Sequence, residues 1–340
     1  MIITMNETAG GEEISHIIKH LEAKNYTPRA RVNGRVHIAA LGKGDAIDWN
    51  ILREAKGVAK IETPEHPFVL ASWQMNPERS VVKVKHVEIS GAGAAVVMAG
   101  PCSVEWREQV LATARAVKES GAVMLRGGAY KPRTSPYEFQ GLGTEGLKLL
   151  REAGDETGLP VITEVMSEDD VEQVAEYADM FQIGARNMQN FSLLRKIGKM
   201  KTPVLLKRGA SATVKEWLCA AEYILAGGNE SVVLCERGIK TFDNSLRNTL
   251  DLASVALVKE LSHLPVIVDP SHACGKRSLV SVLAKAAIAV GADGVIVEVH
   301  PQPEKALSDA AQQLTFNNFA EMMREMQSPL RQVFAAKNHV

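Results

Sequence analysis

Eight short apolar segments recur between residues 94 and 300, and longer amphipathic stretches separate them. Each segment is an almost continuous apolar run, which is typical of a strand buried on both faces and therefore of a parallel sheet. Eight such strand–helix units in about 250 residues fit a closed (β/α)8 TIM barrel, with an open doubly wound sheet as the alternative. The segments are AAVVMAG, AVMLRGG, PVITEV, MFQIGA, PVLLKRG, SVVLCERG, PVIVDPSH and GVIVEVH. We therefore expect an α/β barrel over residues 94–340.

Residues 1–63 follow a different pattern, in which short strands and two helices are predicted in the order β-α-β-β-α-β. Asn33-Gly34 between two apolar segments indicates a tight hairpin, and Asp45 is a possible cap of the second helix. This order is that of a small ferredoxin-like domain. Residues 64–93 are expected to form a linker and then a hairpin, VVKVKHVEIS, that covers one end of the barrel.

Composition excludes several classes of partner. The net charge of −1 gives no general attraction to nucleic acid or to an anionic membrane. There is no apolar run of the roughly 18 residues that a membrane helix needs, and the N-terminus lacks the features of a signal peptide. The four cysteines are widely spaced and form no CxxC pair, which favours a reducing, cytoplasmic location.

Cationic side chains follow several of the predicted strands or lie just beyond them. In a barrel the carboxyl ends of the strands meet at one face, where active sites are built. Arginine and lysine there can bind phosphate and carboxylate groups, so this set fits two phosphates, or one phosphate and a carboxylate. The alternative is that some of them are solvated bases paired with acids. The residues are Arg126, Lys131, Arg133, Arg186, Lys207 and Arg237.

A second set of strand-end residues could bind a metal ion. Cys102, His272 and Glu298 follow three separate strands. A thiolate, an imidazole and a carboxylate suit a divalent ion such as Mn, Fe, Co or Zn, which acts as a Lewis acid when one coordination position is open. Cys274 and His300 are nearby competitors for the same role.

The motifs around these residues resemble those of the 3-deoxy-D-arabino-heptulosonate 7-phosphate (DAHP) synthases, type I, beta subclass. The resemblance covers residues 94 to about 325. Its most specific element is KPRTS, because the related octulosonate 8-phosphate synthases, which use arabinose 5-phosphate, typically have KANRS there. The matching segments are AGPCSVE, LRGGAYKPRTSPY, QIGARNMQN, VLLKRG, LCERG, VDPSHACGKR and IVEVHPQPEKALSD.

The resemblance implies a condensation of phosphoenolpyruvate with erythrose 4-phosphate and water to give DAHP and phosphate, the entry step of the shikimate pathway. It implies that Cys102, His272, Glu298 and Asp309 bind the metal ion. Phosphoenolpyruvate would contact Arg126, Arg186, Lys207 and Arg237, with Lys131 near its carboxylate or the aldehyde. Arg133 and Thr134 would bind the erythrose 4-phosphate end. Lys131 would act in catalysis, and Glu164 or His272 would carry a proton.

In this subclass such N-terminal modules resemble amino-acid sensors, so the resemblance implies feedback inhibition by tyrosine or phenylalanine. The alternative for residues 1–63 is a dimerisation or capping domain, and we expect a homodimer or homotetramer. Two other functions stay open: the octulosonate 8-phosphate synthase reaction, and a non-catalytic barrel that senses metabolites. An aldolase that forms an imine at Lys207 is a further, weaker alternative.

Overall fold

The computed structural model describes residues 1–90 and 93–326. The chain divides into two compact units, of which the first comprises Met1–Arg79 with Leu261–His263 and the second contains the rest. The predicted ranges 64–93 and 94–340 include residues 91–92 and 327–340, which lie outside the described residues.

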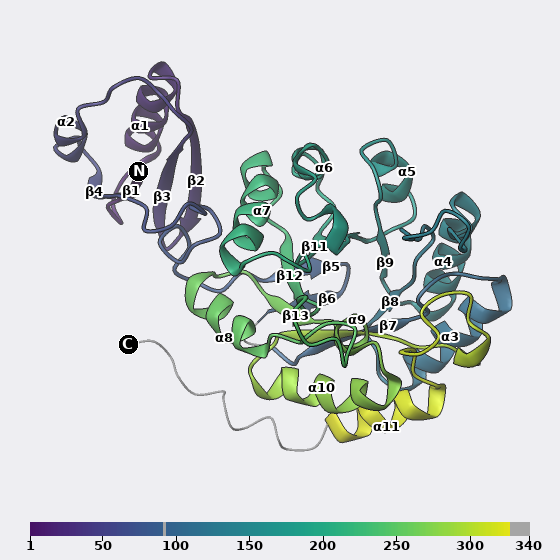
Figure 1. Cartoon of the computed structure of the whole chain (residues 1–340). Coiled ribbons are helices and arrows are strands. Elements are labelled where there is room, and N and C mark those ends of the chain that lie inside the picture. The colour runs from purple at the N-terminus through teal and green to yellow at the C-terminus, as the bar shows by residue number, and fades with distance from the viewer. Residues whose placement is uncertain (91–92, 327–340) are drawn as a thin grey trace. The chain divides into compact units, whose positions relative to one another are not determined.

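The first unit contains a four-stranded antiparallel sheet in the order β2-β3-β1-β4 (Figure 1). Helices α1 and α2 pack on it, since Ile17 and Leu52 share a buried cluster with Ile3 and Ile38. The predicted β-α-β-β-α-β order is confirmed. Its elements are β1 (Ile2–Met5), α1 (Gly11–Ala23), β2 (Thr27–Asn33), β3 (Arg35–Leu41), α2 (Trp49–Arg53) and β4 (Val58–Glu62).

The predicted cap of the second helix was wrong. Helix α2 begins after Asp48, whose side chain accepts a hydrogen bond from the backbone N–H of Asn50 at 3.0 Å. Asp45 instead accepts from Asn25 Nδ2 at 2.8 Å. Both aspartates precede the same short helical segment, so residue type alone could not choose between them.

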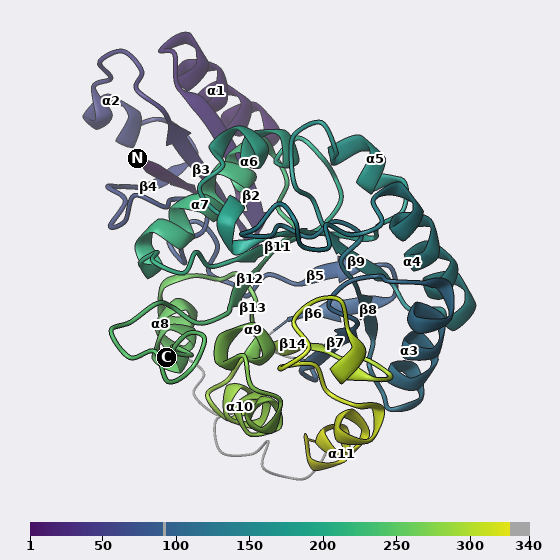
Figure 2. The same cartoon turned by 45° about the vertical axis from the view of Figure 1, so that its right-hand side comes forward.

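The second unit contains a closed barrel of eight parallel strands, and the predicted (β/α)8 fold is confirmed. Strand β14 closes the ring by pairing with β7, from Gly294 opposite Val96 to Glu298 opposite Gly100. Figure 2 shows the helices arranged around the strands. The strands are β7 (Val96–Gly100), β8 (Met124–Arg126), β9 (Val161–Glu164), β10 (Met180–Ile183), β11 (Val204–Lys207), β12 (Val232–Glu236), β13 (Val266–Val268) and β14 (Gly294–Glu298).

The helices of the barrel follow from amphipathic patterns and local caps. In α7, for example, Thr213 and Glu216 form a capping box, and Gly228 ends the helix at a φ of 107°, a conformation that favours glycine. The helices are α3 (Arg107–Glu119), α4 (Thr144–Thr157), α5 (Val171–Ala175), α6 (Phe191–Ile197), α7 (Val214–Gly227), α8 (Leu252–Leu261), α9 (Pro270–Cys274), α10 (Arg277–Ala289) and α11 (Phe316–Met326). Among the described residues, every helix is too short or too polar to cross a lipid bilayer.

A two-stranded hairpin fills the end of the barrel where the strands begin. Its strands are β5 (Val82–Val84) and β6 (Val87–Ile89). Their inward side chains share a buried cluster with barrel residues that include Val96 and Met180, the first residues of β7 and β10. Lys85 at the turn pairs with Asp179 just before β10, at 2.9 Å. The opposite end of the barrel, where the strands finish, is left for the loops that bear the site.

Candidate active site

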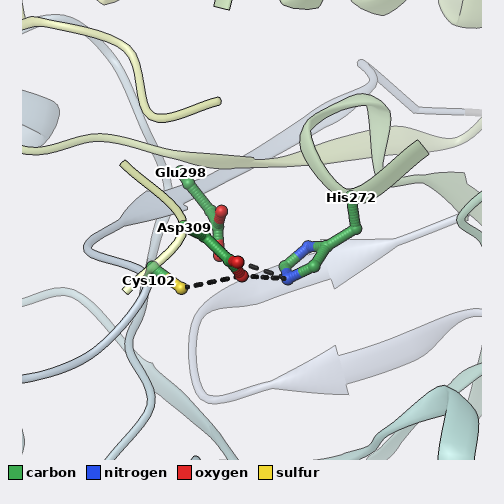
Figure 3. A group of neighbouring side chains, drawn as sticks. All are labelled: Cys102, His272, Glu298 and Asp309. Carbon is green, nitrogen blue, oxygen red and sulfur yellow. Dashed lines mark hydrogen bonds and ion pairs between the residues drawn. The ribbon is translucent and has the colours of Figure 1, made fainter. Parts of the chain in front are cut away.

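Four side chains with metal-binding atoms converge at the carboxyl ends of the barrel strands (Figure 3). Cys102 follows β7, His272 lies in α9 after β13, Glu298 is the last residue of β14, and Asp309 lies on the loop that follows β14. Their ligand atoms all lie within 4.8 Å of one another. His272 Nε2 is 3.3 Å from Glu298 Oε1 and 3.7 Å from Asp309 Oδ2. The structure thus brings together all four predicted metal ligands.

This spacing fits a bound divalent ion. Ligand atoms about 2.0–2.3 Å from a tetrahedral ion are roughly 3.3–3.8 Å apart. The Cys102 thiol lies 3.4 Å from Asp309 Oδ2, so three of the contacts within the cluster fall in or near this range. One sulfur, one imidazole nitrogen and two carboxylates form a mixed donor set that suits Mn, Fe, Co or Zn.

Neighbouring residues orient two of these ligands. His272 Nδ1 donates to Asp269 Oδ2 at 2.7 Å, so its other nitrogen, Nε2, presents a lone pair to the cluster. Glu298 Oε1 accepts from Arg126 at 3.2 Å, and Glu298 Oε2 accepts from Gln312 at 2.5 Å. Both ligands are therefore held in place by protein contacts.

Electrostatics differ between the thiol and the carboxylates of the cluster. Burial, assisted by the nearby Glu298 carboxylate, raises the pKa of the Cys102 thiol to about 12. Burial also tends to raise the pKa of Asp309, but Lys131, His272 and Arg247 outweigh it and hold this pKa well below its ordinary value. The carboxylate is charged at neutral pH, whereas the thiol has to lose a proton to become a ligand.

Lys131 lies directly beside the cluster. Its Nζ donates to Cys102 Sγ at 2.9 Å and is 3.9 Å from Asp309 Oδ2. Burial tends to lower the pKa of Lys131, but Cys102 when it is a thiolate, Glu298 and Asp309 outweigh it and raise this pKa. A fixed ammonium group therefore stands at the edge of the cluster, where it can donate to an oxygen that develops negative charge.

A cavity of about 280 Å³ opens above the cluster. All of the predicted substrate-binding residues line it, and so does Glu164. Glu164 accepts a hydrogen bond from Gln182 at 3.1 Å, and its carboxylate occupies the space where residue 184 would have a Cβ if it were not glycine. The predicted substrate-binding residues in this lining are Arg126, Lys131, Arg133, Thr134, Arg186, Lys207 and Arg237.

Several of these cations have acidic partners, as the alternative interpretation expected. Lys207 pairs with Asp269 at 2.5 Å, and Arg133 pairs with Glu138 at 2.7 Å. Arg237 is buried, and burial lowers the pKa of its guanidinium. The pairs do not remove the positive character of the cavity, because the lining contains seven lysines and arginines but only three aspartates and glutamates.

The competing metal ligands point elsewhere. The Cys274 thiol donates to the carbonyl oxygen of Pro270 at 3.1 Å. His300 accepts a hydrogen bond from the backbone N–H of Gln302 and faces Glu105. Neither residue belongs to the cluster found among the described residues.

Two residues near the cluster were not predicted from the sequence. Arg247, on the loop after β12, pairs with Asp309 at 3.2 Å and donates to Gln312 at 2.9 Å. Gln312 in turn donates to Glu298. Both residues lie in irregular polar segments without periodicity, so only their position in space connects them to the site. Asp269 stands at a strand end, but its role is evident only from its contacts with His272 and Lys207.

Comparison with known proteins agrees with this geometry. The DAHP synthetase I family model matches residues 79–332. The chain is 48% identical over 327 residues to phospho-2-dehydro-3-deoxyheptonate aldolase of Thermotoga maritima, and the match covers 96% of both chains. A crystal structure of the Thermotoga maritima enzyme, also called DAHP synthase, has a TM-score of 0.76 at 47% identity and 96% coverage of both chains.

A more distant relative bears another name. The 2-dehydro-3-deoxyphosphooctonate aldolase of Syntrophotalea carbinolica is 32% identical over 263 residues, which cover 72% of this chain and 94% of the relative. The higher identity and the longer match both lie with the heptonate enzyme. The chain belongs to the DAHP synthetase I family.

Proposed function

We propose that this chain condenses phosphoenolpyruvate with erythrose 4-phosphate and water to give DAHP and phosphate. The observation that supports this most is the convergence, at one cavity, of a four-residue metal-binding cluster with a ring of cations. Two anionic substrates repel each other in water, and cations that bind both reduce that repulsion and the entropic cost of bringing them together.

Phosphoenolpyruvate would lie nearest the buried cations. Arg126, Lys207 and Arg237 are all less than 10% exposed and line the same cavity. Arginine binds phosphate through two parallel hydrogen bonds, and a buried charge strengthens this binding. Arg186 adds a further guanidinium at the more exposed side of the cavity.

Erythrose 4-phosphate would bind with its phosphate at Arg133 and Thr134 and its aldehyde near Lys131. Carbon 3 of phosphoenolpyruvate attacks the aldehyde carbon, and the Lys131 ammonium donates to the aldehyde oxygen as it becomes a hydroxyl. Water then adds to carbon 2, and the tetrahedral product collapses to the ketone as the carbon–oxygen bond to phosphate breaks. Glu164, in the cavity lining, is the candidate to take up the protons of the water. His272, the other candidate, would have both ring nitrogens engaged, one with Asp269 and one with the ion.

A divalent ion held by Cys102, His272, Glu298 and Asp309 would supply Lewis acidity toward the aldehyde oxygen. An imine mechanism at Lys207 is disfavoured, because Lys207 Nζ is engaged in a 2.5 Å ion pair with the buried Asp269.

The test is phosphate release from phosphoenolpyruvate, measured with erythrose 4-phosphate and, in parallel, with arabinose 5-phosphate. We expect release to require the aldehyde, to be faster with erythrose 4-phosphate, to stop with EDTA and to return with a divalent ion. Faster turnover of arabinose 5-phosphate would make the chain an octulosonate 8-phosphate synthase. Binding of both substrates without phosphate release would indicate a metabolite sensor, and trapping with borohydride after EDTA treatment would indicate an imine.

We further propose that the ferredoxin-like region, residues 1–63, binds tyrosine or phenylalanine as a feedback inhibitor, and that the enzyme is a cytoplasmic homodimer or homotetramer with residues 94–340 as its catalytic domain. Inhibition assays with each aromatic amino acid on the full chain, together with light scattering, test both points. Inhibition that persists without residues 1–63 would contradict the first.

A further inference from the structure

Glu105 and His300 form a buried pair behind the metal-binding cluster. Both side chains are fully buried, and Glu105 Oε2 lies 3.5 Å from His300 Nε2. The backbone N–H of Gln302 donates to His300 Nδ1 at 3.0 Å, so the ring proton of a neutral His300 is on Nε2 and faces the carboxylate. The two facing atoms have no closer hydrogen-bond partner within the described chain. This contact alone therefore compensates little of the cost of burying the Glu105 carboxylate.

The other oxygen of Glu105 reaches the loop that contains Asp309. Glu105 Oε1 accepts a hydrogen bond from the backbone N–H of Leu307 at 3.0 Å. The neighbouring hydroxyls of Ser103 and Ser308 are 2.6 Å apart. Two consecutive residues before Asp309 are therefore tied to the loop that follows Cys102.

Gln313 completes this connection between the two loops. Its Oε1 accepts from the backbone N–H of Cys102 at 3.0 Å, and its Nε2 donates to the carbonyl oxygen of Ser308 at 2.9 Å. Each of the two loops provides one side chain of the cluster, Cys102 and Asp309. The other two, His272 and Glu298, lie on regular elements.

Asp309 needs such support more than its partners do. Its φ is +47°, in the left-handed region, which costs an aspartate about 1–2 kcal/mol. It is also half-buried, whereas Cys102 and Glu298 are buried. A strained, partly exposed loop residue keeps its position only if the surrounding contacts fix the backbone.

We propose that Glu105, backed by His300, is a positioning residue that fixes the Leu307–Asp309 segment so that Asp309 can bind the divalent ion together with Cys102. Glu105 is not among the residues that line the cavity in the described chain, so it acts through Asp309 and not on the substrates. This inference rests on the proposed metal-dependent function.

The experiment measures the Kd of Co²⁺ by competition with a chromophoric chelator, using full-length protein stripped of metal. Glu105→Ala should weaken Co²⁺ binding about 10–100-fold, the range for residues that support metal ligands. Glu105→Gln keeps an acceptor for Leu307 but turns an N–H toward His300, so its loss should be smaller. Glu304→Gln is the matched control, because Glu304 is an exposed glutamate on the same loop, and its Kd should stay within about twofold of wild type.

Kinetics separate positioning from catalysis. At saturating Co²⁺ the kcat of Glu105→Ala should return to within about threefold of wild type, and the KM for phosphoenolpyruvate should not change. A folded Glu105→Ala variant with wild-type Kd would overturn the proposal, as would a kcat that stays low at saturating metal. If Glu105→Ala loses its near-UV circular dichroism and is therefore unfolded, the Kd of Co²⁺ is measured for Glu105→Gln and Ser308→Ala instead. Wild-type values for both would overturn the proposal. Wild-type protein that binds no Co²⁺ would instead contradict the proposed metal-dependent function.

Discussion

Replacing Asp269 with asparagine tests the physical basis of the site most directly. Asp269 Oδ2 accepts from His272 Nδ1 at 2.7 Å and from Lys207 Nζ at 2.5 Å, while Oδ1 caps the backbone N–H of His272 at 2.9 Å. Burial tends to raise the pKa of Asp269, but His272 and Lys207 outweigh it and hold this pKa well below its ordinary value. Asp269 is therefore charged, and one carboxylate orients a proposed metal ligand and a proposed substrate ligand together.

The loss of stability expected for Asp269→Asn follows from the burial of the ion pair. The side chains of Lys207 and Asp269 are 4% and 2% exposed. In the Asp269→Asn variant the new side chain can still cap His272, but its amide nitrogen cannot accept from either partner, so Lys207 keeps a buried charge without a counter-charge. Breaking such a pair costs about 3–5 kcal/mol, which corresponds to a decrease in Tm of about 6–20 °C for a domain of this size. Loss of the contact to His272 should also weaken metal binding about 10–100-fold.

The assay combines thermal unfolding by circular dichroism with the Kd of Co²⁺. Asp293→Asn is the matched control, because Asp293 is 1% exposed and pairs with Lys259 at 2.9 Å just before β14, at the opposite end of the barrel. This variant should lower Tm but leave the Kd of Co²⁺ within about twofold. If Asp269→Asn changed neither quantity, or if Asp293→Asn weakened metal binding equally, the reasoning about Asp269 would be wrong.

Three further predictions concern other parts of the chain. Cys102→Ser should weaken Co²⁺ binding at least about tenfold and remove the sulfur-to-metal absorption band, and a retained band would exclude Cys102 as a ligand. Arg133→Ala should raise the KM for erythrose 4-phosphate about 10–100-fold, because it removes a hydrogen bond to a charged group, and should change the KM for phosphoenolpyruvate little. If steady-state kinetics showed the reverse, Arg133 would belong to the phosphoenolpyruvate subsite. Burial lowers the pKa of His263 to about 4 from 6.5, so the unfolded chain takes up a proton in this window that the folded chain does not. The free energy of unfolding should therefore fall, by up to about 3 kcal/mol, as the pH drops from 6.5 to 4. In the His263→Gln variant, urea titrations at several pH values should show a free energy of unfolding that depends less on pH.

The barrel could be predicted from sequence because its strands are buried on both faces. The segment VVMAG has no polar residue, and GVIVE has one only at its last position, Glu298, so the type of element is not left open. The proposed metal ligands Cys102, His272 and Glu298 could be chosen because strand ends converge in this fold. Asp309 lies well beyond the end of β14, and only the resemblance to a family pointed to it.

Contacts between irregular loops could not be predicted in this way. His300 stayed a competitor for the metal at the level of sequence, since its tautomer and direction depend on the N–H of Gln302 and on Glu105. Arg247 reaches the cluster from a loop whose path depends on backbone contacts such as that of Asn248 N–H with the Ala273 carbonyl at 2.8 Å. The cap at Asp48 was likewise decided by geometry within a short helix. In each case the informative partner is distant in sequence or is a backbone group, so residue type says little.

The β5–β6 hairpin adds buried apolar contacts to the barrel at the end opposite the candidate active site. We expect a change in the size of Val84 or Val87 to alter stability more than the spacing between Cys102 and Glu298, because the hairpin packs at the start of the strands and the metal-binding cluster lies at their ends. Adaptation to a warmer or colder habitat can therefore act on the hairpin without retuning the reaction.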